Sequence, residues 1–143
     1  MDVTKRTPID TTSWGHGPWE EEPHEVKWTD EDSGLRCLAR RNRTMGMWCG
    51  YVAVGKDHPA YGKHYDQITA DVHGGLTYAD DGKIDGMDGL WVIGFDCGHG
   101  YDVMPGYSVL IAPIEGAEYR TVDYVTKECR KLAKQLAEMK EGM

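Results

Sequence analysis

Two glycine-flanked segments carry most of the side chains in this chain that could do chemistry. The first covers residues 71–78, with the sequence DVHGGLTY, and the second covers residues 94–102, with the sequence GFDCGHGYD. Each pattern indicates a strand that ends in a tight turn with polar side chains at its tip. If the two strands lie side by side, five side chains converge on one small site: His73, Asp96, Cys97, His99 and Asp102. Such a site would suit a metal ion, a general acid and base, or a polar ligand.

A metal interpretation rests on the imidazole and carboxylate groups of this set, which suit zinc or manganese. The candidate ligands are His73, Asp96, His99 and Asp102. No recognised ligand signature accompanies them, because the sequence contains no His-Glu-x-x-His, no His-x-His-x-Asp and no Cys-x-x-Cys. Asp and His side chains at turns also bond to local backbone amides. A metal-dependent hydrolase, with metal-activated water as its nucleophile, is therefore one alternative.

A nucleophilic interpretation would use Cys97, with His99 or His73 as its base. A single cysteine at a strand end is more often a small buried apolar residue, and the turn at Gly98 makes a shared face with His99 uncertain. The catalytic candidates are accordingly His73, Asp96 and His99, with no catalytic role assigned to any of them.

A binding interpretation rests on the aromatic and glycine residues. The chain has five Trp and eight Tyr against one Phe, together with 18 Gly. Aromatic faces stack on planar bases, glycine turns expose backbone N–H groups to phosphate, and arginines add charge-assisted contacts. The predicted ligand-binding residues are Trp48, Tyr51, His73, Gly74, Gly75, Tyr78, Asp96, His99 and Arg41. This combination favours a small polar, nucleotide-derived ligand and needs no cofactor. The alternative is that the tryptophans fill the core and that Gly74-Gly75 is only a turn.

Composition limits the partners. A net charge of −8 opposes binding of a nucleic-acid polymer. No stretch approaches the roughly 20 apolar residues that cross a membrane, and the first residues lack the apolar core of a secretory signal. The four cysteines are far apart, which predicts reduced thiols and a cytoplasmic protein. A homo-oligomer is compatible with all of these features.

The 143 residues suit one domain, residues 25–143, preceded by an irregular arm over residues 1–24. Trp14 and Trp19 indicate that part of this arm packs on the domain. Strands are expected over residues 25–28, 35–41, 45–54, 67–73, 90–95 and 108–112. The acidic loop over residues 80–89 fails the ligand spacing of a calcium loop.

The clearest helix lies near the C-terminus. Its apolar residues recur at steps of three and four and form one stripe: Val122, Val125, Cys129, Leu132, Leu136 and Met139. Thr121 is suited to cap its start. The predicted fold class is therefore α+β, a small antiparallel sheet of four to six strands with this amphipathic helix packed on one face.

Several motifs together resemble a family of small uncharacterised phage and prophage proteins. They are WCGYV at residues 48–52, HPxYG at 58–62, DVHGGLTY at 71–78, GFDCxH at 94–99 and YVxxECxxLAxQL at 124–136. The match covers about residues 45–137. The resemblance implies a phage gene product that acts in the cytoplasm of the infected bacterium, and it transfers no residue roles.

Three functions follow as hypotheses. The first is a phage accessory protein that sequesters a small nucleotide-derived ligand, by analogy with small phage proteins that counter host defence signalling. The second is the metal-dependent hydrolase described above. The third is an inhibitor that binds a host enzyme through the acidic N-terminal arm.

Overall fold

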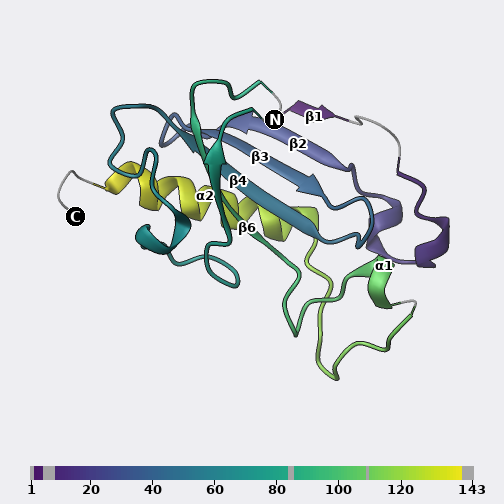
Figure 1. Cartoon of the computed structure of the whole chain (residues 1–143). Coiled ribbons are helices and arrows are strands. Elements are labelled where there is room, and N and C mark those ends of the chain that lie inside the picture. Colours follow the sequence, from purple (N-terminus) through teal and green to yellow (C-terminus); the bar gives the residue numbers. More distant parts are fainter. Residues whose placement is uncertain (1, 5–8, 84–85, 109, 140–143) are drawn as a thin grey trace.

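The computed structural model describes residues 2–4, 9–83, 86–108 and 110–139. Within these residues, six strands form one antiparallel sheet in the order β1-β2-β3-β4-β6-β5. The strands are β1 (Asp2–Thr4), β2 (Glu25–Thr29), β3 (Arg36–Arg41), β4 (Trp48–Val54), β5 (Tyr78–Asp81) and β6 (Trp91–Asp96). The helices are α1 (Pro105–Ser108) and α2 (Val122–Glu138), with short 3-10 helices η1 (Thr12–Trp14), η2 (Pro18–Glu20) and η3 (Tyr65–Gln67). Helix α2 lies across one face of the sheet, which confirms the predicted α+β class (Figure 1).

The main core lies between the sheet and α2. Alternate residues of β2, β3, β4 and β6 point toward the helix and are buried there. The helix contributes the predicted stripe, of which Val125, Cys129, Leu132 and Leu136 are fully buried. The Thr121 hydroxyl accepts a hydrogen bond from the Tyr124 N–H at 3.2 Å, so the predicted cap is also confirmed.

A glycine sets how closely α2 approaches the sheet. A Cβ added to Gly50, in the central strand β4, would lie 2.5 Å from Phe95 Cζ and 2.6 Å from Cys129 Sγ. A side chain at this position would therefore displace the phenyl ring or the helix, and only glycine fits.

The opposite face of the sheet, called the outer face here, is partly covered. Leu38, Ala53 and Val92 point outward and pack under Met87. Tyr51 and Tyr78 lie beside this small cluster and are half-buried. The rest of the outer face carries polar side chains, among them Asp96.

The predicted strand over residues 67–73 is wrong. Ile68 and Val72 are buried as its alternation required, but the backbone pairs with side chains of α2 and not with a strand. The Asp71 N–H donates to Gln135 Oε1 at 2.7 Å, and Gln135 Nε2 donates back to the Asp71 carbonyl at 2.9 Å. Period-two burial therefore arose from an extended segment that lies along a helix.

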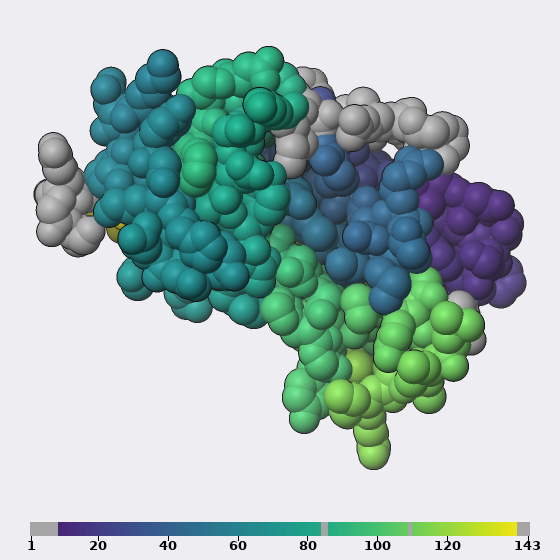
Figure 2. Space-filling view, in the orientation of Figure 1, coloured from purple at the N-terminus to yellow at the C-terminus, as the bar shows by residue number. Residues whose placement is uncertain are grey.

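The predicted strand over residues 108–112 is also wrong. Residues 105–108 form α1, and the N–H groups of Leu110 and Ile111 donate to the Tyr107 carbonyl in local turns; residue 109 lies outside the described residues. Local backbone hydrogen bonds within turns thus replace the cross-strand hydrogen bonds that a strand would make. Figure 2 shows the surrounding segment, in green, standing out from the body at the bottom of the view.

The N-terminal arm is more ordered than predicted. Asp2–Thr4 form an edge strand against β2, so the arm is not wholly irregular. Trp14 and Trp19 are buried, which confirms that part of the arm packs on the domain. In the part of the chain that the structure describes, no helix has the length and apolar character that a membrane crossing requires.

Candidate functional site

The two polar segments meet at one end of the sheet. Tyr78 of β5 pairs with Gly94 of β6, and the Thr77 N–H donates to the Gly94 carbonyl at 3.0 Å. The polar tip precedes β5 in the first segment and follows β6 in the second. Because the two strands are antiparallel, both tips lie at the same end. The tips therefore meet, but the prediction that the first segment is a strand ending in its turn is wrong, because β5 follows that turn.

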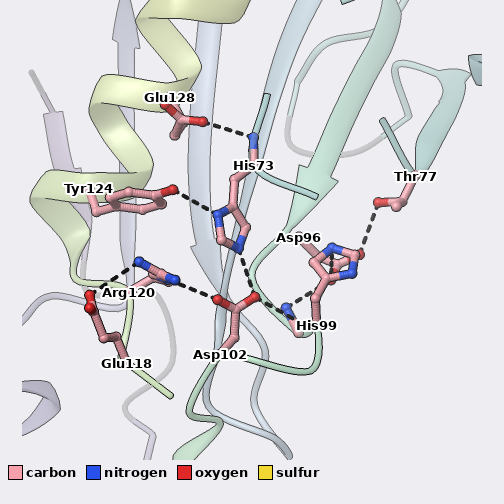
Figure 3. A network of polar contacts seen from close by, with 10 residues as sticks. His73, Thr77, Asp96, His99, Asp102, Glu118, Arg120, Tyr124 and Glu128 are labelled. Carbon is pink, nitrogen blue, oxygen red and sulfur yellow. Dashed lines mark hydrogen bonds and ion pairs between the residues drawn. The ribbon is translucent and has the colours of Figure 1, made fainter. Parts of the chain in front are cut away.

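His73 is held on three sides (Figure 3). Its Nε2 lies 2.7 Å from Asp102 Oδ2, and its Nδ1 lies 2.7 Å from the Tyr124 hydroxyl. Its backbone N–H donates to Glu128 Oε1 at 2.8 Å. With only 13 % of its side chain exposed, His73 is a bridge between the tips and α2.

Asp102 is the centre of this network, with 1 % of its side chain exposed. Besides the contact with His73, it accepts hydrogen bonds from Arg120 Nε at 2.8 Å and from the His99 N–H at 3.0 Å. Burial alone would raise the pKa of Asp102, but the hydrogen bonds from His73 and Arg120 outweigh it and lower the pKa. The carboxylate is therefore ionised at neutral pH and can only accept.

This charge assigns the proton positions on His73. Nε2 carries the proton that it donates to Asp102, so in the neutral ring Nδ1 accepts from the Tyr124 O–H. Burial and the nearby Glu128 carboxylate raise the pKa of Tyr124, which keeps its phenol protonated. Both ring nitrogens of His73 are thus used within the protein.

His99 has a different environment. Its Nε2 lies 3.5 Å from Asp96 Oδ1, and the two side chains are 38 % and 29 % exposed. Nε2 itself is buried, and none of the described residues makes a hydrogen bond to it. The exposed part of the ring therefore lies away from Nε2, so His99 is the imidazole that a ligand can reach. The two histidine rings lie 5.8 Å apart, centroid to centroid.

Asp96 is oriented by its neighbours. The Thr77 hydroxyl donates to its Oδ2 at 2.9 Å, and the Gly98 N–H donates to its Oδ1 at 2.9 Å. Asp96 with His99 is consequently a fixed and partly exposed carboxylate–imidazole pair.

The glycines Gly74 and Gly75 form the turn beside this pair. Their φ angles are 68° and 79°, which glycine adopts readily. The Gly75 N–H donates to the Val72 carbonyl at 2.9 Å, so the turn itself uses this donor. A Cβ on Gly74 would lie 2.1 Å from His99 Nε2, which shows that the His99 ring packs directly on the Gly74 backbone.

Tyr51 and Tyr78 lie on the outer face near the pair. Both tyrosines pair with Gly94 of β6, Tyr51 from one side and Tyr78 from the other. Their rings meet edge to face across this glycine, with centroids 5.3 Å apart. A Cβ on Gly94 would lie 2.5 Å from Tyr51 Cδ1, so the glycine makes room for this ring. Asp96 is two residues further along β6 on the same face, about 7 Å away along the strand.

Trp48 and Arg41 do not reach this site. Both are buried on the other side of the sheet, where the guanidinium carbon of Arg41 lies 4.9 Å from the centroid of the Trp48 ring. They belong to a cluster that joins the N-terminal arm to the sheet and α2.

Cys97 is buried in the main core, and burial raises the pKa of its thiol. A thiol in this state is a poor nucleophile, which agrees with the interpretation of Cys97 as a small apolar residue.

The metal candidates are close together but already bonded. Both nitrogens of His73 and both oxygens of Asp102 have partners within the network. Among the described residues, no group of three or more His, Cys, Asp or Glu side chains is arranged to hold a metal ion. Metal binding by all four candidates would require some of these hydrogen bonds to break.

Sequence reasoning missed four members of the network: Thr77, Arg120, Tyr124 and Glu128. Tyr124 and Glu128 are four residues apart on α2, so they share a face. That spacing was visible in the sequence, but the segment that the face contacts was not.

Comparison with known proteins adds no family to this geometry. No family model, no curated protein and no solved structure matches the chain. The resemblance to phage and prophage proteins stays a prediction, and the function is argued from the site itself.

Proposed function

We propose that this protein binds a small polar, nucleotide-derived ligand on the outer face of the sheet, where β4, β5 and β6 meet the two polar tips. The observation that carries the proposal is the partly exposed Asp96–His99 pair, oriented by hydrogen bonds and adjacent to the Tyr51–Tyr78 pair.

The chemistry of these groups suits the parts of a nucleotide. Asp96 is an acceptor for sugar hydroxyls or a base amino group, and the partly exposed ring of His99 lies beside it. The tyrosine rings offer flat apolar surface, and a stacked base gains about 1–3 kcal/mol from such a contact. A ligand with hydroxyl donors and an aromatic ring would use both pairs at once.

Basic side chains lie on the same face, toward β2 and β3. Arg40 of β3 pairs with Cys49 of β4, which pairs with Asp96 of β6. Lys27 of β2 is separated from Tyr51 of β4 only by Leu38 of β3, with which both residues pair. With strands about 4.8 Å apart, Arg40 is roughly 10 Å from Asp96 across the sheet. Arg40 forms an ion pair with the buried Glu25, its Nε 3.3 Å from Glu25 Oε1, so part of its charge is balanced within the protein. Lys27 adds a second positive charge on this side of the face, where the phosphate of a bound nucleotide would lie.

The proposal is tested by titration calorimetry with a defined panel: adenosine and guanosine monophosphate, ADP-ribose and cyclic dinucleotides. We expect one class to bind, and we expect His99→Ala and Tyr78→Ala each to weaken binding at least about tenfold, a loss of about 1.4 kcal/mol. Tyr107→Ala, which removes an exposed tyrosine on α1, is the matched control. Unchanged affinity in both site variants would refute the proposal. So would a wild-type protein that binds none of the panel and shows no bound organic mass in native mass spectrometry.

A metal-dependent hydrolase is the second candidate, favoured by the convergence of His73, Asp96, His99 and Asp102. Dialysis against Zn²⁺ or Mn²⁺ followed by elemental analysis tests it, with His16→Ala as a control for loss of an exposed histidine. One equivalent of metal, lost in His99→Ala and kept in His16→Ala, would support this candidate. A wild-type protein without bound metal after dialysis would reject it.

The biological role that we infer is sequestration of a nucleotide signal of host defence in the cytoplasm of an infected bacterium. This step rests on the resemblance to phage proteins. Phage that encode His99→Ala should lose protection in cells that carry the matching defence. Full protection by this variant would favour the third alternative, inhibition of a host enzyme by direct contact.

A further inference from the structure

Glu22, in the N-terminal arm, makes an unusual set of contacts for a surface-arm residue. Its side chain is only 9 % exposed. Oε1 accepts hydrogen bonds from Arg41 Nη2 at 2.9 Å, from Trp48 Nε1 at 3.4 Å and from the Tyr119 hydroxyl. Oε2 accepts from the Val122 N–H at 2.6 Å.

The partners of Glu22 come from separate parts of the fold. Arg41 and Trp48 belong to adjacent strands β3 and β4, whereas Val122 is the first residue of α2. Arg41 is itself buried, and it also donates to the Gly46 carbonyl at 2.8 Å and to the Tyr119 hydroxyl at 2.7 Å. One carboxylate of the arm therefore fixes the start of α2 to the sheet.

The start of α2 also builds the candidate site. Arg120, the neighbour of Tyr119 in the chain, donates to Asp102, which in turn contacts His73 and the His99 backbone. Tyr124, in the first turn of the helix, contacts His73. The same short stretch, residues 119–124, is thus held by Glu22 on one side and holds the site network on the other.

We propose that Glu22 is a positioning residue for the candidate site. Its carboxylate fixes residues 119–124 so that Arg120 and Tyr124 meet Asp102 and His73. Release of the arm frees the first turn of α2, and the orientation of the two histidines is then lost. The N-terminal arm in this way controls whether the site is assembled, although it contributes no group to it. The link to ligand binding rests on the proposed function, whereas the link to the histidines does not.

The test follows the imidazole groups directly by long-range ¹H–¹⁵N NMR of the full chain. In the wild type we expect the His73 ring N–H to be protected from exchange with water by its bond to Asp102. In Glu22→Ala we expect its exchange to accelerate at least about tenfold, because the partners of His73 open more often. Glu21→Ala, an exposed neighbour in the arm, is the matched control and should behave as wild type.

Each outcome decides the inference. A folded Glu22→Ala protein whose His73 ring exchanges as slowly as in the wild type overturns it. If Glu22→Ala does not fold, Glu22→Gln is measured by the same criterion, since the amide keeps an acceptor but loses the charge. Affinity for the nucleotide panel is measured on the same samples. Faster exchange together with no binding by any variant, wild type included, would reject the proposed function and leave the positioning role intact.

Discussion

At the scale of single residues, the two histidines of the site have different freedom to react. His73 uses both ring nitrogens within the protein, with Asp102 and Tyr124 as partners. His99 exposes more than a third of its side chain beside Asp96. His73 is therefore a bridging imidazole and His99 an accessible one. A substitution that tests ligand contact should be made at His99.

Among the residues of the network, we expect substitution of Asp102 to lower the free energy of unfolding most. Asp102→Asn removes a buried charge from Arg120 and His73, and we expect unfolding to become easier by about 2–4 kcal/mol at pH 7. The pKa of Asp102 is lowered in the folded protein, below the unfolded value of about 3.9. Its contribution is therefore fully present above that value and disappears as the pH falls through the folded pKa.

Urea unfolding at pH 7 and at acid pH measures both effects. The stability difference between wild type and Asp102→Asn should shrink toward acid pH. Asp57→Asn, which alters an exposed carboxylate, is the control and should follow the wild type at each pH. A difference that is the same at every pH would contradict the assigned charge of Asp102.

At the scale of elements, the contact between α2 and β4 depends on Gly50. Gly50→Ala introduces a methyl group 2.5 Å from Phe95 Cζ, and we expect destabilisation by about 1–3 kcal/mol from overpacking. Gly55→Ala is the control, because nothing lies within 4 Å of its added Cβ. Urea unfolding of the two variants gives the comparison. Equal stability of the two would show that the helix can move away from the sheet without cost.

The elements also show what a sequence can predict. Helix α2 follows from its three-and-four periodicity, the β2–β3 hairpin from its acidic turn, and β4 and β6 from continuous apolar runs. The segment over residues 67–73 alternates as strictly as a strand, but its backbone partners are side chains of Gln135 and Glu128, more than fifty residues away. No local pattern contains that information.

The site was predictable to a similar extent. Residue types at the two tips indicated His73, Asp96, His99 and Asp102, and the antiparallel pairing of β5 with β6 brings them together. Trp48 and Arg41 were expected beside them and are buried elsewhere. Residue type alone does not show whether a tryptophan or an arginine lines a pocket or fills the core. Only the tertiary fold distinguishes these two environments.

At the scale of the whole molecule, the arm and the sheet are joined around Arg41. The guanidinium carbon of Arg41 lies 5.9 Å from the ring centroid of Trp14 in the arm and 4.9 Å from that of Trp48 in the sheet. Because Glu22 joins both parts, we expect the arm to unfold together with the sheet in one transition. Tryptophan fluorescence and far-UV circular dichroism should give the same midpoint in urea. An earlier fluorescence change that disappears in a Trp14→Phe/Trp19→Phe variant would show instead that the arm detaches first.

The segment that follows α1, which stands out from the body at the bottom of Figure 2, affects how copies of the molecule behave in concentrated solution. Leu110, Ile111 and Ile114 are 81 %, 53 % and 55 % exposed. The net charge of −8 keeps copies apart at neutral pH, but it vanishes near the isoelectric point of about 5.1. We expect light scattering to report growing particles as the pH approaches 5. We expect Leu110→Lys with Ile114→Lys to suppress these particles more than the change in net charge alone would. Asp57→Asn with Asp66→Asn changes the net charge by the same amount at exposed positions and is the control. Colloidal repulsion, and not a well-covered surface, then decides the conditions under which this protein can be concentrated or crystallised.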